Sequence, residues 1–497
     1  MLRGLVAKIN HIWSTHDTGV NSKNCGHVPF SDLEEAKSQL KELGLKVSDT
    51  KAKFDAEELS GGCYSLVKTS DYLVDYARGM LHAHPYREVP GYWREYYSDA
   101  GILKALALVL LSKQPTPPKD ASGTSTEEDK DDEAQIQPLK LAVIACDNVL
   151  IMAGASGQGR QAFVFELIDY LENQIRDLDN TRPLESPTLK RQKIEAVKGV
   201  KLGEEPPIDQ GPRIRCAIPR VHLPTMDAFQ SHVNTLDAEG GATPIIITGA
   251  IDHWPAMERW ADLETICRTA GPDRLVPIEV GSQYTDETWT QKMVTFREFV
   301  DRFILGTHES PSKGSGDGEV KGGVGYLAQH DLFAQIPRLR RDIDISDYCM
   351  IDTRVQEGYQ PPDDVLLNAW FGPRGTVSPM HTDPYHNLLA QVVGRKYIRL
   401  YSPQESPKLY CYGSDSNGDE QRGQETSEES AGMTTANMLS NTSQVDVENP
   451  DLGRHPLFAE ATYVETVLEP GELLYIPFQW WHYVRSLSTS FSVSSWF

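Results

Sequence analysis

Three residues in the C-terminal half of the chain have the types and spacing of a metal site. His381 and Asp383 stand two apart in Ser378-Pro-Met-His-Thr-Asp-Pro-Tyr-His-Asn387, and His482 follows much later in the chain. In an extended strand, side chains two apart point to the same side and lie about 7 Å apart. An imidazole and a carboxylate can then share one ion. Two histidines and one carboxylate form the facial triad of non-haem Fe(II) oxygenases, which leaves positions open for co-substrate and O2.

A His-x-Asp pair by itself is a weak signal, because most such pairs bind no metal. Lys396 adds a second feature. It stands in a β-rich stretch around Gly394-Arg395, which predicts two strands joined by a turn. A lysine that points into a small barrel is costly unless an anion meets it, and a carboxylate of 2-oxoglutarate is such an anion. The triad together with an inward lysine is therefore a specific signal.

The segments around these residues resemble the JmjC domain family. The resemblance rests on Gly325-Tyr-Leu-Ala-Gln-His330, Asn368-Ala-Trp-Phe-Gly-Pro373, Tyr401-Ser-Pro-Gln-Glu405, Gly471-Glu-Leu-Leu-Tyr-Ile-Pro477 and Trp481-His-Tyr483. It covers residues 213–497 and extends more faintly into the N-terminal half. It implies a double-stranded β-helix of the jelly-roll type, with Fe(II) bound by the triad and with 2-oxoglutarate and O2 as co-substrates.

The resemblance also implies roles for residues around the triad. The family positions that bind 2-oxoglutarate match Tyr326, Ser378, Asn387 and Lys396. The positions that line the substrate pocket match Glu279, Trp289 and Trp370. A carboxylate beside indoles suits a guanidinium, through a bidentate ion pair and a cation–π contact. The alternative for both tryptophans is an ordinary place in the core, since tryptophan is mostly buried in proteins.

A third histidine in the same segment complicates the metal assignment. His386 could compete as a ligand, but it stands an odd number of residues from both His381 and Asp383. In a regular strand, an odd separation turns a side chain to the other face. We therefore expect His386 to point away from the metal.

The family resemblance implies a 2-oxoglutarate-dependent dioxygenase, and it leaves the substrate open. Family members are described as arginyl hydroxylases, histone lysine demethylases and peptidases. An arginine-shaped pocket favours hydroxylation of arginine in a protein or peptide, with histone tails among the candidate partners. Histone lysine demethylation is one alternative, and a non-catalytic JmjC scaffold is another. No nucleophile–base pair in the sequence supports a peptidase.

Composition limits the function classes. The 497 residues contain 71 acidic and 48 basic side chains, for a net charge of −23. This charge argues against direct nucleic-acid binding, which needs a basic surface. It is compatible with a basic peptide substrate, although solvated acidic loops explain the same composition. The seven cysteines are scattered, which is typical of a reducing compartment, either nucleus or cytoplasm.

The pattern along the chain predicts an α+β protein with two domains. Residues 1–180 are predicted to form an all-α helical domain, with a disordered acidic loop near residues 115–134. Within it, Ser31-Asp-Leu-Glu34 predicts the start of a helix and Gly44 its end. Residues 181–212 are predicted as a linker. Residues 213–497 are the predicted JmjC catalytic domain, a cupin-like double-stranded β-helix.

Strands of the catalytic domain are predicted at residues 363–371, 376–383, 387–393, 396–401, 462–467, 472–476 and 489–496. Further short strands are predicted at 214–218, 244–248 and 276–280, and helices at 225–236 and 295–305. A polar insertion near 410–439 separates two of these strands. No membrane span is predicted, since the apolar run at 102–111 is too short. The chain ends after the last predicted strand, without the helices by which some related hydroxylases dimerise, so we expect a monomer.

Overall fold

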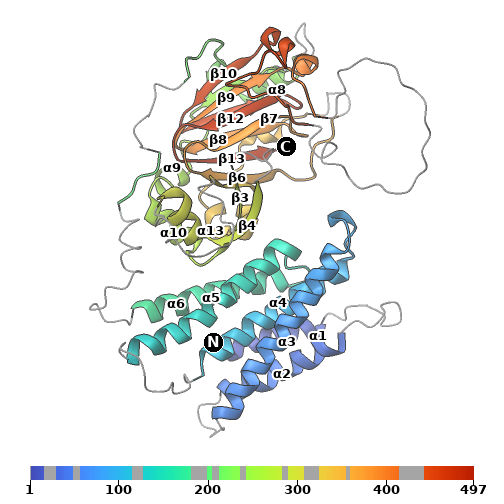
Figure 1. Cartoon of the computed structure of the whole chain (residues 1–497), viewed down its shortest axis with the longest axis vertical. Coiled ribbons are helices and arrows are strands. Elements are labelled where there is room, and N and C mark those ends of the chain that lie inside the picture. The colour runs from blue at the N-terminus through green and yellow to red at the C-terminus, as the bar shows by residue number, and fades with distance from the viewer. Residues whose placement is uncertain are drawn as a thin grey trace, which may run out of the picture. The chain divides into compact units, whose positions relative to one another are not determined.

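A computed structural model describes the chain as two compact units. The described residues are 2–15, 30–48, 56–114, 127–180, 199–203, 212–235, 242–281, 289–306, 324–353, 359–412 and 441–497. The first unit comprises Met1–Thr188 together with Asp273–Leu275, and the second comprises Leu189–Pro272 with Val276–Phe497. Figure 1 shows helices in the first unit and mainly strands in the second. This α+β organisation confirms the fold class predicted from the sequence.

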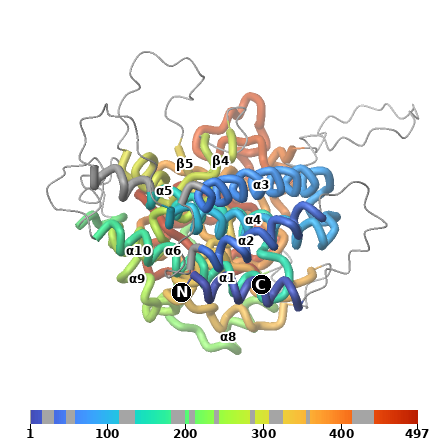
Figure 2. Tube along the Cα trace, turned by 90° about the horizontal axis from the view of Figure 1, so that it is seen from below, coloured from blue at the N-terminus to red at the C-terminus, as the bar shows by residue number. Residues whose placement is uncertain are grey.

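The first unit is a bundle of helices. Its long helices are α1 (Leu2–Thr15), α2 (Phe30–Ser48), α3 (Ala56–His82), α4 (Gly91–Ser112), α5 (Glu127–Ala153) and α6 (Arg160–Asn180). Each helix packs against its neighbour in sequence, and α1 also contacts α6. Helices α2, α3 and α4 lie side by side in both views (Figures 1 and 2). Helix α4 is buried along most of its length because α2, α3 and α5 surround it.

Two helix boundaries differ from the sequence predictions. Helix α2 runs from Phe30 to Ser48, so Ser31 and Gly44 both lie inside it. Glycine inside a helix costs about 1 kcal/mol relative to alanine. Here a Cβ on Gly44 would meet the two γ-carbons of Val6 at 3.1 and 3.2 Å, so the glycine allows α1 to approach. Helix α5 begins at Glu127, inside the loop predicted near residues 115–134. Residues 115–126 lie outside the described residues.

Helix α5 is a core helix with a buried carboxylate. Its stretch Gln135–Ala153 is long and apolar enough to cross a membrane by length and composition alone, but 56% of that window is buried. Asp147 on this helix accepts hydrogen bonds from Nε and Nη2 of Arg274 at 2.9 and 2.7 Å, and from the Leu275 N–H at 2.7 Å. Both side chains of the ion pair are buried. Such a pair belongs in a protein interior.

A second buried carboxylate joins four helices of the first unit. Asp99 on α4 accepts hydrogen bonds from Arg160 Nε on α6 at 2.6 Å and from Lys37 Nζ on α2 at 3.0 Å. The Trp13 indole on α1 donates to it at 2.8 Å. Burial would raise the pKa of Asp99, but the hydrogen bonds and charges of Arg160 and Lys37 lower it overall. One carboxylate therefore ties α1, α2 and α6 to α4.

The second unit is a sandwich of two sheets. The larger has the strand order β1-β2-β11-β8-β13-β6-β5-β3-β4, and the smaller has the order β10-β9-β12-β7. The strands are β1 (Arg220–His222), β2 (Ile245–Thr248), β3 (Leu275–Val280), β4 (Thr290–Thr295), β5 (Gly325–His330), β6 (Leu366–Gly372), β7 (Val377–His381), β8 (Asn387–Val393), β9 (Lys396–Tyr401), β10 (Val464–Leu468), β11 (Glu472–Ile476), β12 (Trp481–Ser486) and β13 (Ser490–Trp496).

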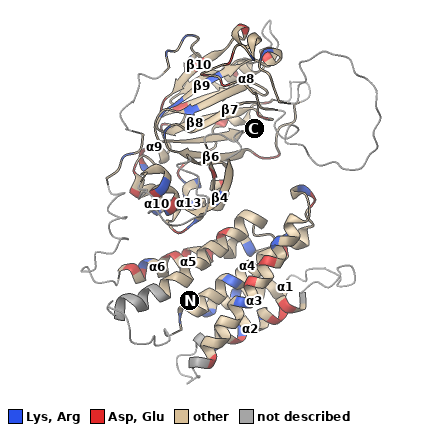
Figure 3. Cartoon of the chain, in the orientation of Figure 1, with Lys and Arg blue, Asp and Glu red and all other residues tan. Residues whose placement is uncertain are grey.

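Apolar side chains fill the space between the sheets and cover their outer faces. Between the sheets, Ile246, Leu389 and Leu474 of the larger sheet meet Ile398, Leu400 and Val484 of the smaller. The outer face of the larger sheet packs under α8 (Met226–Val233), α9 (Ala256–Arg259), α10 (Leu263–Ala270), α11 (Phe296–Phe299), α12 (Leu332–Gln335) and α13 (Pro337–Arg340). Figure 3 shows that the strands carry few acidic or basic residues. A charged side chain between the sheets is therefore an exception that needs a reason.

Several elements of the second unit differ from their predictions. Residues 214–218 form no strand, and only Ala217 makes an isolated bridge, to Glu465. The predicted helix 295–305 changes after α11 into a π-helical turn at Val300–Ile304. Leu202, inside the predicted linker, is 5% exposed and belongs to the core. The sequence predicts no strand where β1, β4, β5 and β12 lie. From residue 413 to 440, the predicted polar insertion lies outside the described residues.

Replacing Asp99 with asparagine should destabilise the first unit by about 3–5 kcal/mol, because Arg160 and Lys37 lose their buried carboxylate. Urea unfolding of the full chain, followed by circular dichroism at the helix band, measures the effect. The control Asp75→Asn breaks an exposed pair with Arg78 and should change stability by less than about 1 kcal/mol. Equal losses in the two variants would contradict the structural role of Asp99.

Candidate metal centre and active site

His381, Asp383 and His482 come together at the inner face of the smaller sheet. His381 is the last residue of β7 and is the register partner of His482 on β12. The His381 Nε2 lies 3.6 Å from Asp383 Oδ1, and the His482 Nε2 lies 3.4 Å from Asp383 Oδ2. The ligand atoms all lie within 4.8 Å of one another. This spacing suits one ion with ligand bonds of about 2.0–2.2 Å.

Backbone carbonyls orient both imidazole rings. The Nδ1–H of His381 donates to the Pro379 carbonyl at 2.7 Å, and that of His482 donates to the Trp480 carbonyl at 3.0 Å. A ring nitrogen that faces a carbonyl carries the proton, so each Nε2 keeps its lone pair for the ion. The donor set of the triad therefore fits a metal ion.

Burial and the carboxylate set the protonation of the triad. Burial, aided by the neighbouring His482, lowers the pKa of His381 to about 4. Burial also disfavours charge on His482, but Asp383 raises its pKa overall. The pKa of Asp383 is lowered overall, because the histidines and a hydrogen bond from Asn387 outweigh burial. Metal binding favours the neutral form of both imidazoles and the ionised form of Asp383.

Asp383 does not lie on the strand predicted over residues 376–383. Strand β7 ends at His381, and Asp383 occupies the turn before Pro384. The Thr382 N–H donates to the Asn441 carbonyl at 3.0 Å instead of continuing the sheet. Proline lacks the N–H that a longer strand would need. The carboxylate therefore reaches the histidines from a turn, and not from the same face of a strand.

A buried lysine lies in the same interior. Lys396, the first residue of β9, is 2% exposed, and its Nζ donates to the Tyr326 hydroxyl at 3.2 Å. Burial lowers its pKa to about 7, with no carboxylate of the described residues to offset this. Ser378 hydrogen-bonds Tyr326, and Asn387 hydrogen-bonds Asp383. Tyr326 thus adjoins the lysine and Asn387 adjoins the triad. A buried cation of this kind suits an anionic ligand.

The residues predicted to line the substrate pocket are grouped around Tyr326. Glu279 on β3 is the register partner of Tyr326 on β5. The Trp289 indole N–H donates to Glu279 Oε2 at 3.4 Å, and burial raises the pKa of Glu279 overall. The ring of Trp370 on β6 lies 6.1 Å from the Tyr326 ring, and its N–H donates to Ser494 Oγ at 2.9 Å. A carboxylate and two indoles therefore occur together in this part of the fold.

Comparison with known proteins identifies the family. The profile of a family described as "Cupin-like domain" matches residues 236–497. The chain is 38% identical over 436 residues to Lysine-specific demethylase 8 of Danio rerio, which covers 87% of this chain and 88% of that protein. The same-named protein of Xenopus tropicalis is 36% identical over 459 residues, with 86% and 87% covered. Jumonji C domain-containing protein 5 of Drosophila melanogaster is 35% identical over 424 residues, with 85% of each chain covered.

The chain belongs to the JmjC family. It is therefore an enzyme of the 2-oxoglutarate-dependent dioxygenase class. Its triad is consistent with the Fe(II) site of JmjC enzymes, since two imidazoles and one carboxylate form the donor set of non-haem Fe(II) oxygenases. The family relationship also indicates protein substrates.

His386, the third histidine of the JmjC metal segment, has other partners. Its Nδ1 accepts hydrogen bonds from the Tyr475 hydroxyl at 2.9 Å and from the Phe478 N–H at 3.2 Å. Its ring packs 4.7 Å from the Tyr359 ring. Among the described residues, the group able to hold an ion does not include it.

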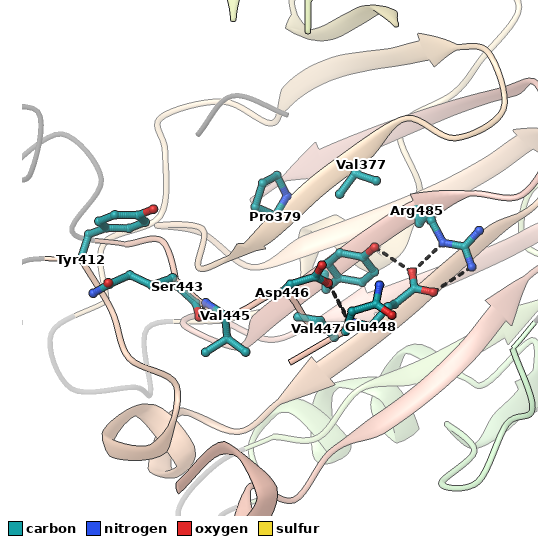
Figure 4. Close-up of a pocket in the computed structure, with 12 residues that line it drawn as sticks. Val377, Pro379, Tyr412, Ser443, Val445, Asp446, Val447, Glu448 and Arg485 are labelled. Carbon is teal, nitrogen blue, oxygen red and sulfur yellow. Dashed lines mark hydrogen bonds and ion pairs between the residues drawn. The ribbon is translucent and has the colours of Figure 1, made fainter. Parts of the chain in front are cut away.

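A separate cleft lies on the outer face of the smaller sheet of the JmjC domain (Figure 4). On β12, Tyr483 and Arg485 line it while His482 points to the opposite face, since side chains alternate along a strand. Glu448 in the cleft already accepts hydrogen bonds from Tyr483 at 2.7 Å and from Arg485 at 2.5 and 2.9 Å. The metal triad therefore lies on the other face of the smaller sheet from this cleft.

Sequence reasoning missed the groups that hold the side chains of the JmjC site in their orientations. The carbonyls of Pro379 and Trp480 leave no mark in the sequence, because every residue has a carbonyl. Ser494 did leave a signal. Serines recur at 490, 492 and 494, and all three are fully buried on β13. This period of two indicates a polar strand face turned to the interior.

Replacing His381 with alanine should weaken Co(II) binding by more than about 100-fold, beyond the range for residues that only support a ligand. Co(II) serves as a spectroscopic stand-in for Fe(II), and its d–d absorption reports the affinity. The control His222→Ala changes an exposed histidine on β1 and should leave the affinity unchanged. Full Co(II) affinity in His381→Ala would exclude the triad as the metal centre.

Proposed function

We propose that this JmjC enzyme hydroxylates arginine side chains in protein substrates, with 2-oxoglutarate and O2 as co-substrates. One oxygen atom enters a substrate C–H bond, and the other enters succinate as 2-oxoglutarate loses CO2. Fe(II), when held by His381, Asp383 and His482, would supply the redox chemistry that joins the two half-reactions. The remaining residues bind and orient the two organic substrates.

The carboxylate of Glu279 is the single observation that supports arginine. No basic side chain of the described residues forms an ion pair with it, so its charge is available to a ligand. A guanidinium offers two parallel N–H donors to a carboxylate and is weakly hydrated, which reduces the cost of entering a half-buried site. The Trp289 indole holds one carboxylate oxygen, and the Trp370 ring, held by Ser494, offers a face to the cation.

Lys396 and its neighbours support 2-oxoglutarate as the co-substrate. The Lys396 ammonium can pair with the distal carboxylate, which restores the charge balance of the interior. The Tyr326 and Ser378 hydroxyls add hydrogen bonds beside it. Asn387 Oδ1 is buried without a hydrogen-bond partner among the described residues, so a ligand or water can use it. One end of the dianion thus meets a cation, while its keto-acid end can reach the triad.

Histone lysine demethylation is the second candidate. The name Lysine-specific demethylase 8, which the Danio rerio and Xenopus tropicalis relatives carry, favours demethylation of lysine. A demethylase would use the same triad and the same Lys396. It would differ at Glu279, because a methylated ammonium offers few or no N–H donors, whereas a guanidinium offers five. A non-catalytic scaffold would require neither the oriented imidazoles nor an unpaired buried lysine.

The decisive experiment incubates the full chain, Fe(II), 2-oxoglutarate and O2 with paired peptides that contain arginine or methyl-lysine at one position. Mass spectrometry should show the gain of one oxygen on the arginine peptide. Glu279→Gln should lower kcat/KM for that peptide by roughly 10–100-fold, because a buried charged hydrogen bond is worth about 1.5–3 kcal/mol. Turnover of 2-oxoglutarate without peptide should stay near the wild-type rate. Loss of a methyl group from lysine, with arginine unchanged, would reject arginine hydroxylation.

The KM for 2-oxoglutarate should rise with pH above about 7, because Lys396 is protonated below its lowered pKa and must take up a proton above it. The rise approaches about tenfold per pH unit. Lys396→Arg keeps its charge and should remove this dependence. The KM for the arginine peptide should fall as the pH rises through the raised pKa of Glu279, because this carboxyl must ionise to bind. A flat 2-oxoglutarate profile in the wild type would contradict the role of Lys396.

A further inference from the structure

His386 connects the turn that carries Asp383 to the turn that leads into His482. His386 lies between Asp383 and the start of β8. Its Nδ1 accepts a hydrogen bond at 3.2 Å from the main-chain N–H of Phe478, and Phe478 lies shortly before His482 in the chain. The Tyr475 hydroxyl reaches the same nitrogen at 2.9 Å. One imidazole thus ties the turn after β7 to the turn between β11 and β12.

The hydrogen-bond partners of His386 determine which of its ring nitrogens carries the proton. A main-chain N–H can only donate, so Nδ1 of His386 is the acceptor and Nε2 carries the proton. Burial lowers the pKa of His386 to about 4, which keeps the ring neutral near pH 7. The rings of Tyr359, Phe478 and Phe497 lie 4.7, 6.3 and 5.9 Å away. The imidazole therefore presents one polar acceptor to the turn from within an aromatic cluster.

The turn that His386 holds leads directly to a ligand. Within it, Gln479 has a φ of +64°, which is uncommon for a residue other than glycine. The next residue, Trp480, accepts the Nδ1–H of His482 on its carbonyl at 3.0 Å. The N–H that His386 holds and the carbonyl that aims His482 thus belong to one short, tightly bent segment. A displacement of the Phe478 N–H would therefore also displace the Trp480 carbonyl, which orients His482.

We propose that His386 is a positioning residue of the metal centre, whose Nδ1 holds the Phe478 N–H so that the Trp480 carbonyl keeps the His482 ring aimed at the ion. The role rests on the metal site of the proposed function, although not on its choice of substrate. A positioning residue acts through its acceptor nitrogen, whereas a packing residue acts through its volume. Substitutions that separate these two properties test the role.

Two variants separate the acceptor from the volume. His386→Asn keeps an acceptor, because the asparagine Oδ1 lies as many bonds from Cα as the histidine Nδ1 does, but it loses the ring. His386→Leu keeps apolar volume and has no acceptor. Tyr475→Phe is the matched control, since it removes the other donor to Nδ1 and leaves the hydrogen bond to Phe478 intact.

In the metal-free full chain, hydrogen exchange at the Phe478 amide should accelerate in His386→Leu. It should stay slow in wild type, in His386→Asn and in Tyr475→Phe. Titration with Co(II), followed by d–d absorption, should show about 10–100-fold weaker affinity for His386→Leu and less than about a threefold change for the other two, as expected for a residue that supports a ligand. Neither readout requires turnover.

Wild-type Co(II) affinity in His386→Leu, or equal losses in His386→Leu and His386→Asn, would overturn the positioning role and leave His386 a packing residue. If His386→Leu does not fold, His386→Gln replaces it, because its acceptor lies one bond further out and does not match Nδ1. A wild-type chain that bound no Co(II) would reject the metal centre and both proposals together. Metal binding with an unchanged His386→Leu would reject the positioning role alone.

Discussion

The antiparallel pairing of β7 with β12 is the constraint on which the catalytic site depends. It sets His381 opposite His482, with an irregularity in the register directly after His482. A slip of one residue would turn every side chain of β12 to the other face. Tyr483 and Arg485 on the outer face are held by Glu448, which opposes such a slip. The hydrogen bonds of Glu448 in the outer cleft (Figure 4) thus help to fix the register of β12, the strand that carries His482.

Charges in this protein serve two different purposes. In the helical unit, the buried Asp99 and Asp147 are each paired with arginine, and they join elements of the structure. In the sandwich, Lys396 and Glu279 are both neighbours of Tyr326, and neither has an ion-pair partner among the described residues. Burial lowers the pKa of Lys396 and raises that of Glu279, and both shifts favour the neutral form of the side chain. Ligands of opposite charge would restore the ionised forms, which is why we propose the unpaired charges as binding positions, whereas the paired ones join elements of the core.

The β-sandwich was largely predictable because its strands are short, β-rich and separated by recognisable turns. The strands that were missed have weaker patterns. β12 reads Trp-His-Tyr-Val-Arg-Ser, without a clear alternation of apolar and polar residues, because one face carries the metal site and the other carries the side chains that Glu448 holds. In the helical unit, the sequence instead predicted a boundary that does not exist. Gly44 predicts a helix end, but the packing of α1 against α2 requires a small residue there, and tertiary contact overrides local propensity.

The sequence by itself determined the family, the jelly-roll class and a set of candidate metal ligands. The candidate ligands follow from a His-x-Asp pair and a later histidine, supported by a lysine predicted to face inward. The family and the jelly-roll class follow from the resemblance of the surrounding segments to JmjC domains. Only the tertiary structure decided that Asp383 reaches the triad from a turn, that Trp370 is held by Ser494, and that His386 binds the turn before His482. Each of these depends on hydrogen bonds between groups far apart in the chain, and main-chain groups are the same at every residue. The order of side chains along the sequence therefore does not show which of these groups meet.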